Sequence, residues 1–279
     1  MRAPAKPGSP SAAAISLFRS LSRCGALGLQ IYAVADVEIR KLLRDPTELA
    51  TRSLQPVLWL VIFGEVFNGV AAVPTGGTSY LAFLTPGVLA QSVLFASIFF
   101  GISVIWEKDL GIVQKLLVSP AYRPALVLGK AISAGFRGLV QAVIVYALAL
   151  LLGVDIAMAP GPLAGAVALV VLGAAAFSTF SLIIACWVRT RERFMGIGQV
   201  LTMPLFFASN AIYPLSIMPG WLRWIATFNP LTYLVDGLRT LMLRGGVGHY
   251  PLGWDFLVLC CSLAVLVAAA STLYPRLGQ

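Results

Sequence analysis

The chain has 279 residues, of which 59% are hydrophobic and only 11% are charged, and its formal net charge is +9. Ordinary soluble domains hold roughly 45–50% apolar and 25% charged residues, so this composition excludes a soluble protein and indicates several membrane spans. The positive charge does not indicate a nucleic-acid partner, because Lys and Arg avoid the apolar blocks and gather in alternate connections.

The N-terminal part of the chain lacks a long apolar block. Residues 1–29 have early positive charge and a brief apolar run that Arg19 stops, so we expect a disordered cytoplasmic tail. Residues 30–46 are expected to form an amphipathic helix that lies at the membrane interface and ends at Pro46. Its apolar face holds Ile31, Ala35, Ile39 and Leu42, and its charged face holds Asp36, Arg40 and Arg44.

Six apolar blocks follow, and they predict an all-α polytopic membrane protein in which residues 30–279 form one six-span domain. The spans are expected at about 54–72, 81–106, 126–154, 163–188, 195–213 and 254–274.

Three features inside these blocks carry structural expectations. The second span is long enough to tilt or to kink at Pro86-Gly87. Lys130 and Arg137 near the start of the third span are expected to extend their side chains toward the membrane surface. Small residues of the fourth span, such as Gly165 and Gly173, are expected to let neighbouring helices approach closely.

The distribution of Lys and Arg predicts the orientation of the chain. Of the 20 such residues, 17 lie in the N-terminal segment, in the second-to-third connection with its flank, in "RTRERF" and at the C-terminus. The connections on the opposite side hold the other three. Because cytoplasmic segments are enriched in Lys and Arg, both termini are expected in the cytoplasm.

Residues 214–253 connect the last two spans, and they are too apolar for a free loop yet too short and broken to cross twice. Two short helices that dip into the outer leaflet and return would satisfy the backbone, with Asn229 and Pro230 at the corner. Asp236 and Arg239 lie three residues apart on the second helix and are expected to pair. Either this pair fixes the helix as an outer gate, or it is an exposed pair of little energetic weight.

Polar residues inside the spans are candidates for a substrate path. Glu65 and Asn68 lie one turn apart in the first span, where a buried charge is costly and usually faces a cavity or a partner. Extension of Glu65 to the nearby surface is the equal alternative. Gln91 and Asn210 are weaker candidates, because hydrogen bonds between helices explain such residues equally well. With one histidine, His249, and no Cys-x-x-Cys, no metal site is expected.

Two segments carry a resemblance to a known family. The stretch "YPLSIMPGWLRWIATFNPLTYLVDGLRTL" (213–241) resembles the re-entrant hairpin before the last span in membrane subunits of ABC-type exporters of the type-2 permease family, which includes daunorubicin exporters. The stretch "WEKDLGIVQKLLVSPAYRPALVLGK" (106–130) resembles that family's cytoplasmic coupling segment.

The resemblance implies an inner-membrane export subunit without catalytic residues, which moves an amphiphilic drug or lipid. It also implies two copies of a separate ABC ATPase, a second permease subunit that is identical or homologous, and surrounding lipid. ATP and Mg would be bound by the ATPase, because the chain has no G-x-x-x-x-G-K-[ST] loop. The implied coupling segment spans 107–124, and its candidate contacts are Glu107, Lys108, Asp109, Leu110, Gly111, Leu116 and Leu117.

The residues of this segment give a physical reason for such a role. A short helix would place Ile112, Val113, Leu116 and Leu117 on one apolar face, which suits either a groove in an ATPase or the lipid surface. The resemblance favours the ATPase.

Other functions stay open at this point. A polysaccharide or glycolipid ABC exporter is one alternative, and an ion-coupled secondary transporter is another. An intramembrane enzyme is not favoured, because the chain has no Gly-x-Ser-x-Gly, His-Glu-x-x-His or paired intramembrane aspartates.

Overall fold

The computed structural model of the chain describes residues 28–40, 54–64, 66, 79–118, 123–188 and 190–278. Within these ranges the elements are helices, and the only extended pairing is an isolated antiparallel bridge between Ile156 and Leu243. The predicted all-α class is therefore confirmed for the described part of the chain.

The described elements are helices, and three of them begin at a side-chain cap. Residues 28–40 and 54–58 are helical, and η1 (Trp59–Phe63) continues the second of these. The following elements are α4 (Tyr80–Ile98), α5 (Phe100–Asp109), α6 (Ile112–Val118), α7 (Arg123–Leu151), α8 (Pro160–Trp187) and α9 (Arg191–Phe207). The chain ends with η2 (Leu215–Ile217), α10 (Gly220–Phe228), α11 (Pro230–Met242), α12 (Leu252–Leu273) and η3 (Tyr274–Gly278). Ser79, Thr190 and Asn229 cap α4, α9 and α11 through their side chains.

Four helical segments in the described residues are long and apolar enough to cross a membrane. They are Tyr80–Asp109, Arg123–Leu151, Pro160–Trp187 and Leu252–Leu277. They correspond to four of the six predicted spans. The predicted first span lies partly outside the described residues, and α9 has only 17 residues because the helix ends at Phe207 rather than near residue 213. The count of six spans therefore stays a prediction.

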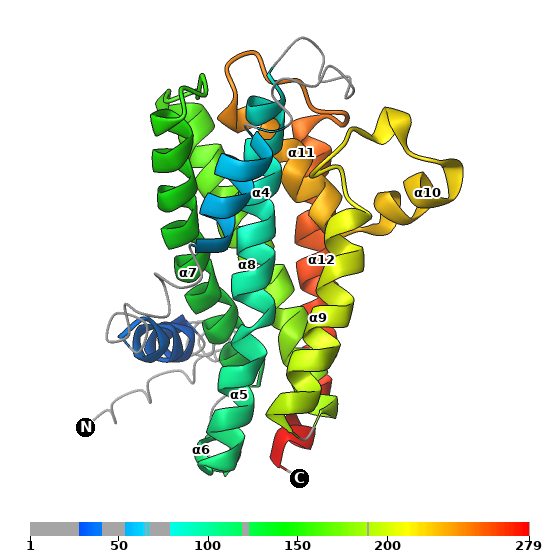
Figure 1. Cartoon of the computed structure of the whole chain (residues 1–279). Helices are drawn as coiled ribbons and strands as arrows, with labels where there is room; N and C mark the ends of the chain where they lie inside the picture. Colours follow the sequence, from blue (N-terminus) through cyan, green and yellow to red (C-terminus); the bar gives the residue numbers. More distant parts are fainter. Residues whose placement is uncertain are drawn as a thin grey trace, which may run out of the picture.

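Helix α8 lies at the centre of the bundle, with α4, α7, α11 and α12 packed around it (Figure 1). The expected close approaches of the fourth span are present. A Cβ atom built on Gly173 would lie 2.7 Å from the Leu234 side chain of α11, and one on Gly165 would lie 2.9 Å from Leu241. Glycine at these two positions therefore lets α11 pack directly against α8.

The second predicted span consists of two helices rather than one. Helix α4 continues through Pro86, and the interruption comes at Phe99, between α4 and α5. Ser181 of α8 fills this break, because its hydroxyl accepts a hydrogen bond from the Gly101 amide (3.0 Å) and donates one to the carbonyl of Ile98. The buried backbone groups at the break are satisfied by a residue from another helix.

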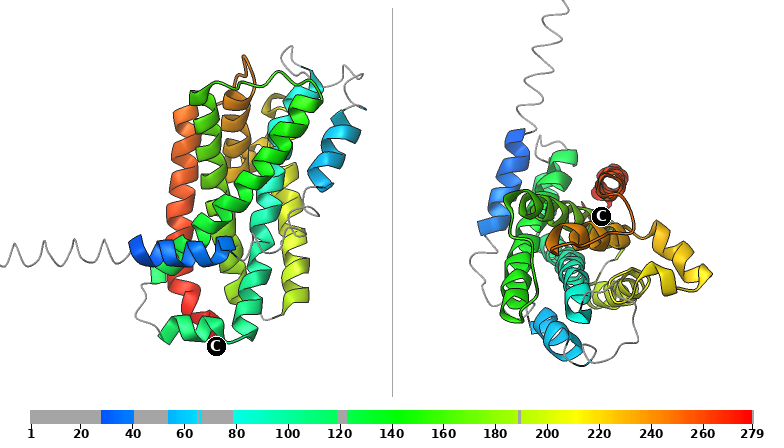
Figure 2. Two further views of the ribbon diagram at one scale, coloured as in Figure 1. Left: turned by 90° about the vertical axis from the view of Figure 1, so that its left-hand side faces the viewer. Right: turned by 90° about the horizontal axis from the view of Figure 1, so that it is seen from above.

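Two short helices run across the bundle near one end. Helix 28–40 lies across α7, and α6 lies across the tip of the bundle beside the C-terminus (Figure 2, left). We call this end, with α6 and the C-terminus, the lower end, and the opposite end, with the loop after α11, the upper end (Figure 1). The described residues of the expected N-terminal tail, Gly28 and Leu29, belong to the helix, and the rest of that tail lies outside the described residues.

Candidate functional site

The predicted coupling segment forms an elbow at the lower end. Helix α5 continues to Asp109, two turn residues follow, and α6 leaves in a new direction (Figure 2, left). Gly111 has φ +71°, a left-handed conformation that glycine adopts without a steric penalty, and its amide donates to the Lys108 carbonyl at 3.0 Å. The predicted short helix with Ile112, Val113 and Leu116 is present as α6, and Gly111 separates it from α5 by a turn that was not predicted from the sequence.

The apolar face of α6 is not free. Val113 is fully buried with Tyr274 and Leu277 of the C-terminal segment, and Leu116 packs against the same cluster. Leu110 and Val118 point away from it, with exposed fractions of 65% and 88%. The side chain of Leu117 and residues 119–122 lie outside the described residues. The face available to a partner thus differs from the one that the helical pattern indicated.

A buried ionic cluster joins three segments above the elbow. The Nζ atom of Lys130 on α7 lies 2.6 Å from a carboxylate oxygen of Glu107 on α5 and 3.2 Å from one of Glu38 on the N-terminal helix. All three side chains are at most 7% exposed. Buried charges are tolerated only where they are paired and hydrogen-bonded, so the cluster fixes these three helices relative to one another.

The expectation that Lys130 and Arg137 reach the membrane surface is wrong. Both are buried, and their cationic groups also lie over the Phe100 ring, 5.5 and 5.0 Å from its centroid. Glu107, one of the candidate ATPase contacts, faces inward with 5% exposure. Lys130 and Glu107 thus have their partners inside the bundle, where Glu38 supplies a carboxylate that the apolar pattern of the N-terminal helix had not indicated.

The exposed side of the N-terminal helix matches the prediction. Arg40 donates to the Asp36 carboxylate at 2.8 Å across one helical turn. Ala35 is buried, and a Cβ atom built on Gly129 of α7 would lie 2.6 Å from Val34, so the helix rests closely on α7.

A second polar cluster lies at the upper end, around α11. Asp236 accepts hydrogen bonds from the amides of His249 (2.9 Å) and Tyr250 (2.8 Å) and from the Asn210 side chain (3.1 Å). Arg239 donates to the Asn210 carbonyl at 2.8 Å, and its guanidinium lies 3.9 Å from the centroid of the Phe83 ring. Both side chains are buried.

The expected direct ion pair between Asp236 and Arg239 is absent from the described residues. Each group finds better-placed partners on other segments, and Asn210 joins the two, because its amide group donates to Asp236 while its backbone carbonyl accepts from Arg239. The alternative of an exposed pair is also wrong, since Asp236 is 1% and Arg239 is 7% exposed. Asn210 belongs to this cluster and lines a different pocket from the one that Gln91 lines.

The corner between α10 and α11 is at the predicted residues. Asn229 ends α10 and caps α11, with its side-chain oxygen accepting from the Leu231 amide at 3.0 Å, and Pro230 is the first helical residue. The amide nitrogen of Asn229 donates to the carbonyls of Leu205 (2.6 Å) and Ala208 (3.2 Å) at the end of α9.

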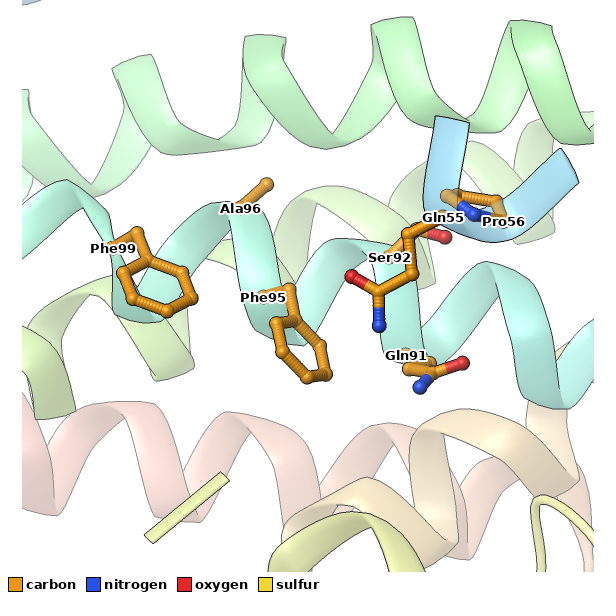
Figure 3. A pocket seen from close by; sticks show the side chains of 7 residues that line it. All are labelled: Gln55, Pro56, Gln91, Ser92, Phe95, Ala96 and Phe99. Atoms are coloured by element: carbon orange, nitrogen blue, oxygen red, sulfur yellow. The ribbon is translucent and has the colours of Figure 1, made fainter. Parts of the chain in front are cut away.

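A cavity of about 300 Å³ lies midway along the bundle, between α4 and the helix at residues 54–58. The ring of Phe95 and the amide of Gln91 line it from α4, the ring of Phe99 lines it from the break after α4, and Gln55 and Pro56 close the opposite side (Figure 3). Among the described residues, the Gln91 amide has no hydrogen-bond partner in the protein, and the lining residues carry no charge. Of the predicted path residues, Gln91 lines this cavity, whereas Glu65 and Asn68 lie outside the described residues.

Two buried charged residues were missing from the sequence prediction, Glu38 and Asp255. Asp255 on α12 is fully buried, and neither carboxylate oxygen has a hydrogen-bond partner in the described part of the chain. Each is a charged residue in or beside an apolar helix, a signal that alone could have singled them out. In the ranges that the structure describes, no group of three or more His, Cys, Asp or Glu could hold a metal ion.

Comparison with known proteins places these features in a family. Residues 29–243 match the family model described as "ABC-2 type transporter", a range that runs from the N-terminal helix to the end of α11. The daunorubicin resistance ABC transporter permease protein DrrB1 of Streptomyces coeruleorubidus is 32% identical over 235 residues, which cover 83% of this chain and 80% of that protein.

Two further relatives are similarly named. The inner membrane transport permease YadH of Escherichia coli strain K12 is 26% identical over 220 residues, which cover 73% of this chain and 79% of YadH. The protein ycf38 of Cyanophora paradoxa, named as a transport permease, is 29% identical over 205 residues, which cover 72% of this chain and 70% of ycf38. The family does not favour an ion-coupled secondary transporter. From the matched range and these relatives we conclude that the chain is a membrane protein of the ABC-2 type transporter family.

Proposed function

We propose that this chain is the permease subunit of an ATP-driven exporter that moves an amphiphilic drug or lipid out of the cytoplasm or the inner leaflet. The observation that carries the proposal is the elbow of α5 and α6, which presents a short transverse helix at the tip of a bundle of apolar helices. Such an elbow can receive the movement of a partner and pass it to the bundle as a rigid body.

The partner is an ABC ATPase, which docks on Leu110 and Val118. Leu110 lies just before α6 and Val118 is its last residue, and Gln114 and Lys115 are exposed between them. Two copies of the ATPase bind ATP and Mg and serve two permease subunits, identical or homologous. The absence of a phosphate-binding loop in this chain supports the assignment of ATP hydrolysis to the partner.

The chain crosses the inner membrane six times, and the lower end of the bundle faces the cytoplasm. The excess of Lys and Arg in the segments near that end supports this orientation. Helices α10 and α11 form a re-entrant hairpin in the outer leaflet. In support, Trp221, Trp224 and Phe228 of α10 are 67–70% exposed, which suits contact with lipid.

The cavity at Gln91 lies on the substrate path. Its two aromatic rings, its unpartnered amide and its lack of charge suit an uncharged region of an amphiphile that carries hydrogen-bonding groups. The name of the DrrB1 relative, a daunorubicin resistance protein, agrees with this substrate class.

Co-purification with the ATPase tests the proposal. We expect the wild-type chain to retain a stoichiometric ATPase in mild detergent and Val118→Asp to lose it, because the added charge must be desolvated at the contact. Val247→Asp is the matched control, since Val247 is 83% exposed at the upper end, against 88% for Val118.

Two results would contradict the proposal. One is that Val118→Asp and Val247→Asp retain the ATPase equally well. The other is that the purified chain, reconstituted alone, moves solute on an ion gradient without ATP.

A further inference from the structure

Helix α9 is fastened at both ends and loosely held between them. Along its length only Phe194, Gly198, Thr202 and Phe206 are buried, which is about one residue per turn on a single face. Leu201 and Leu205 are half-buried beside this face, and the other apolar side chains of α9 are exposed, with Val200 at 70% and Phe207 at 44%. A helix that packs through so narrow a stripe can shift along its axis with little repacking.

The lower end of α9 holds the elbow through its first residue. Arg191 donates to the Asp109 carboxylate at 2.7 Å, and its guanidinium lies 3.5 Å from the centroid of the Trp106 ring. Trp106 and Asp109 form the last turn of α5, directly before the turn into α6. Arg191 therefore contacts both the carboxylate of Asp109 and the aromatic ring of Trp106 in that turn.

The next turn of α9 presses on the junction between α4 and α5. A Cβ atom built on Gly101 would lie 2.3 Å from the Phe194 ring, and one on Gly198 would lie 3.5 Å from Ile98. Because the α-helical pattern is interrupted at Phe99, α5 can tilt relative to α4 there, and α9 lies against that point.

The upper end of α9 holds the corner between α10 and α11. The last carbonyls of a helix have no hydrogen-bond partner within the helix. Here the carbonyls of Leu205 and Ala208 accept hydrogen bonds from the side-chain amide of Asn229, at 2.6 and 3.2 Å. Asn229 is 4% exposed and also caps α11, so a shift at the end of α9 moves the first turn of α11.

We propose that α9 acts as a connecting rod, by which we mean a helix that passes the movement of the elbow to the α10–α11 hairpin. The contacts of Arg191 with the elbow and of Asn229 with the end of α9 are its lower and upper fastenings. This inference rests on the proposed function, in which the ATPase moves the elbow and the α10–α11 hairpin opens toward the outside. Arg191 is a positioning residue, because it touches neither ATP nor substrate and acts through Asp109 and Trp106.

The lower fastening can be removed without unfolding the protein. The side chains of Arg191 and Asp109 are 32% and 45% exposed, and ion pairs of that exposure contribute little to stability. Arg193, two residues later, is exposed and has no side-chain partner among the described residues, so Arg193→Ala is the matched control.

Transport by the permease reconstituted with its ATPase is the first readout. We expect Arg191→Ala to keep the ATPase bound and its basal hydrolysis unchanged, while substrate moved per ATP falls at least about fivefold, the lower end of usual coupling between sites. Arg191→Lys should recover part of the loss, because it keeps the charge but not the planar stacking on Trp106. Unchanged transport in Arg191→Ala would overturn the inference.

Spin-label distances show where the transmission stops. The four native cysteines are replaced, and cysteine labels are placed at Ile112 on α6, outside the proposed docking residues, and at Ile225 on α10, each measured against a fixed label on α12. In the complex without these rod mutations, trapping ATP should shift both distances. In Arg191→Ala the Ile112 distance should still shift and the Ile225 distance should not.

The outcomes separate the two proposals. A shift at Ile225 in Arg191→Ala equal to that of the unmutated complex would refute the connecting rod and leave the proposed function intact. No shift at either label in the unmutated complex would contradict the proposed function, and the rod with it.

Discussion

Two buried aspartates at the upper end differ in what surrounds them. Asp236 receives three hydrogen bonds, two of them from backbone amides of the loop after α11. Asp255 receives no hydrogen bond from the described residues. It lies close to α11 all the same, because a Cβ atom built on Gly237, the residue after Asp236, would be 3.4 Å from the Asp255 side chain. The contribution of a buried carboxylate to the free energy of unfolding depends on the hydrogen-bond donors around it, so the same substitution should act differently at the two positions.

We expect Asp236→Asn to lower the free energy of unfolding and Asp255→Asn to leave it unchanged or raise it. An amide at residue 236 turns a donor toward a backbone amide that needs an acceptor, which costs about 1–3 kcal/mol. At residue 255 the amide removes a charge that no donor stabilises. Thermal unfolding of the two variants in detergent, followed by tryptophan fluorescence, gives the comparison. Equal losses of stability would show that Asp255 has partners that this arrangement does not contain.

Among the elements, the elbow depends on one glycine for its direction. Gly111 and Gly153 both have positive φ, at +71° and +75°, and each ends a helix, but Gly111 lies in the elbow and Gly153 follows α7 at the upper end. A Cβ atom at either position meets no atom closer than 3.9 Å, so the strain of a substitution is confined to the backbone.

Gly111→Ala and Gly153→Ala should each lose about 1–2 kcal/mol of stability, the cost of a side chain in the left-handed region. Only Gly111→Ala should impair ATP-driven transport, because relief of its strain changes the angle between α5 and α6. Transport by each variant in vesicles that contain the ATPase, at matched amounts of folded protein, tests this. If Gly153→Ala impairs transport as strongly, the effect comes from stability and not from the elbow.

For the whole molecule, the position of α12 stands out. Only 11% of its most apolar window is buried within the chain, against 78% for α4 and α5 together. In water the exposed apolar face of such a helix would favour aggregation, whereas in a bilayer this face can contact lipid or another subunit. The described part of the chain thus behaves as a membrane bundle, with the elbow at one end and the hairpin at the other.

The orientation of this bundle can be measured with single cysteines at Glu192 and Val247 in a chain without Cys24, Cys186, Cys260 and Cys261. Both positions are exposed and lie at opposite ends, Glu192 at the start of α9 and Val247 in the loop after α11. A maleimide that cannot cross membranes should label residue 247 in intact cells and residue 192 only after the cells are opened, because positively charged segments stay in the cytoplasm. Labelling in the reverse order would place the elbow outside.

Much of the architecture could be predicted from the sequence. Apolar length and helix period predicted the membrane helices, and Asn229-Pro230 predicted the corner, because a side-chain cap followed by proline starts a helix in almost any environment. These signals are local. The elbow was predicted only in part. The sequence showed that the apolar span ends at the charged residues from Glu107 onward, but it did not predict the turn at Gly111.

The partners of the charged side chains were decided by tertiary structure alone. Lys130 meets Glu38 from 92 residues away, and Asp236 meets Asn210 from 26 residues away. In the sequence, Arg239 was the nearest counter-charge to Asp236, yet each group found partners on other segments. A buried charge is stabilised by whichever donors and acceptors surround it in space, and helix packing, not spacing along the chain, brings those groups together. The sequence by itself thus determined which stretches form apolar helices, and the fold determined where these helices break and which of their polar groups meet.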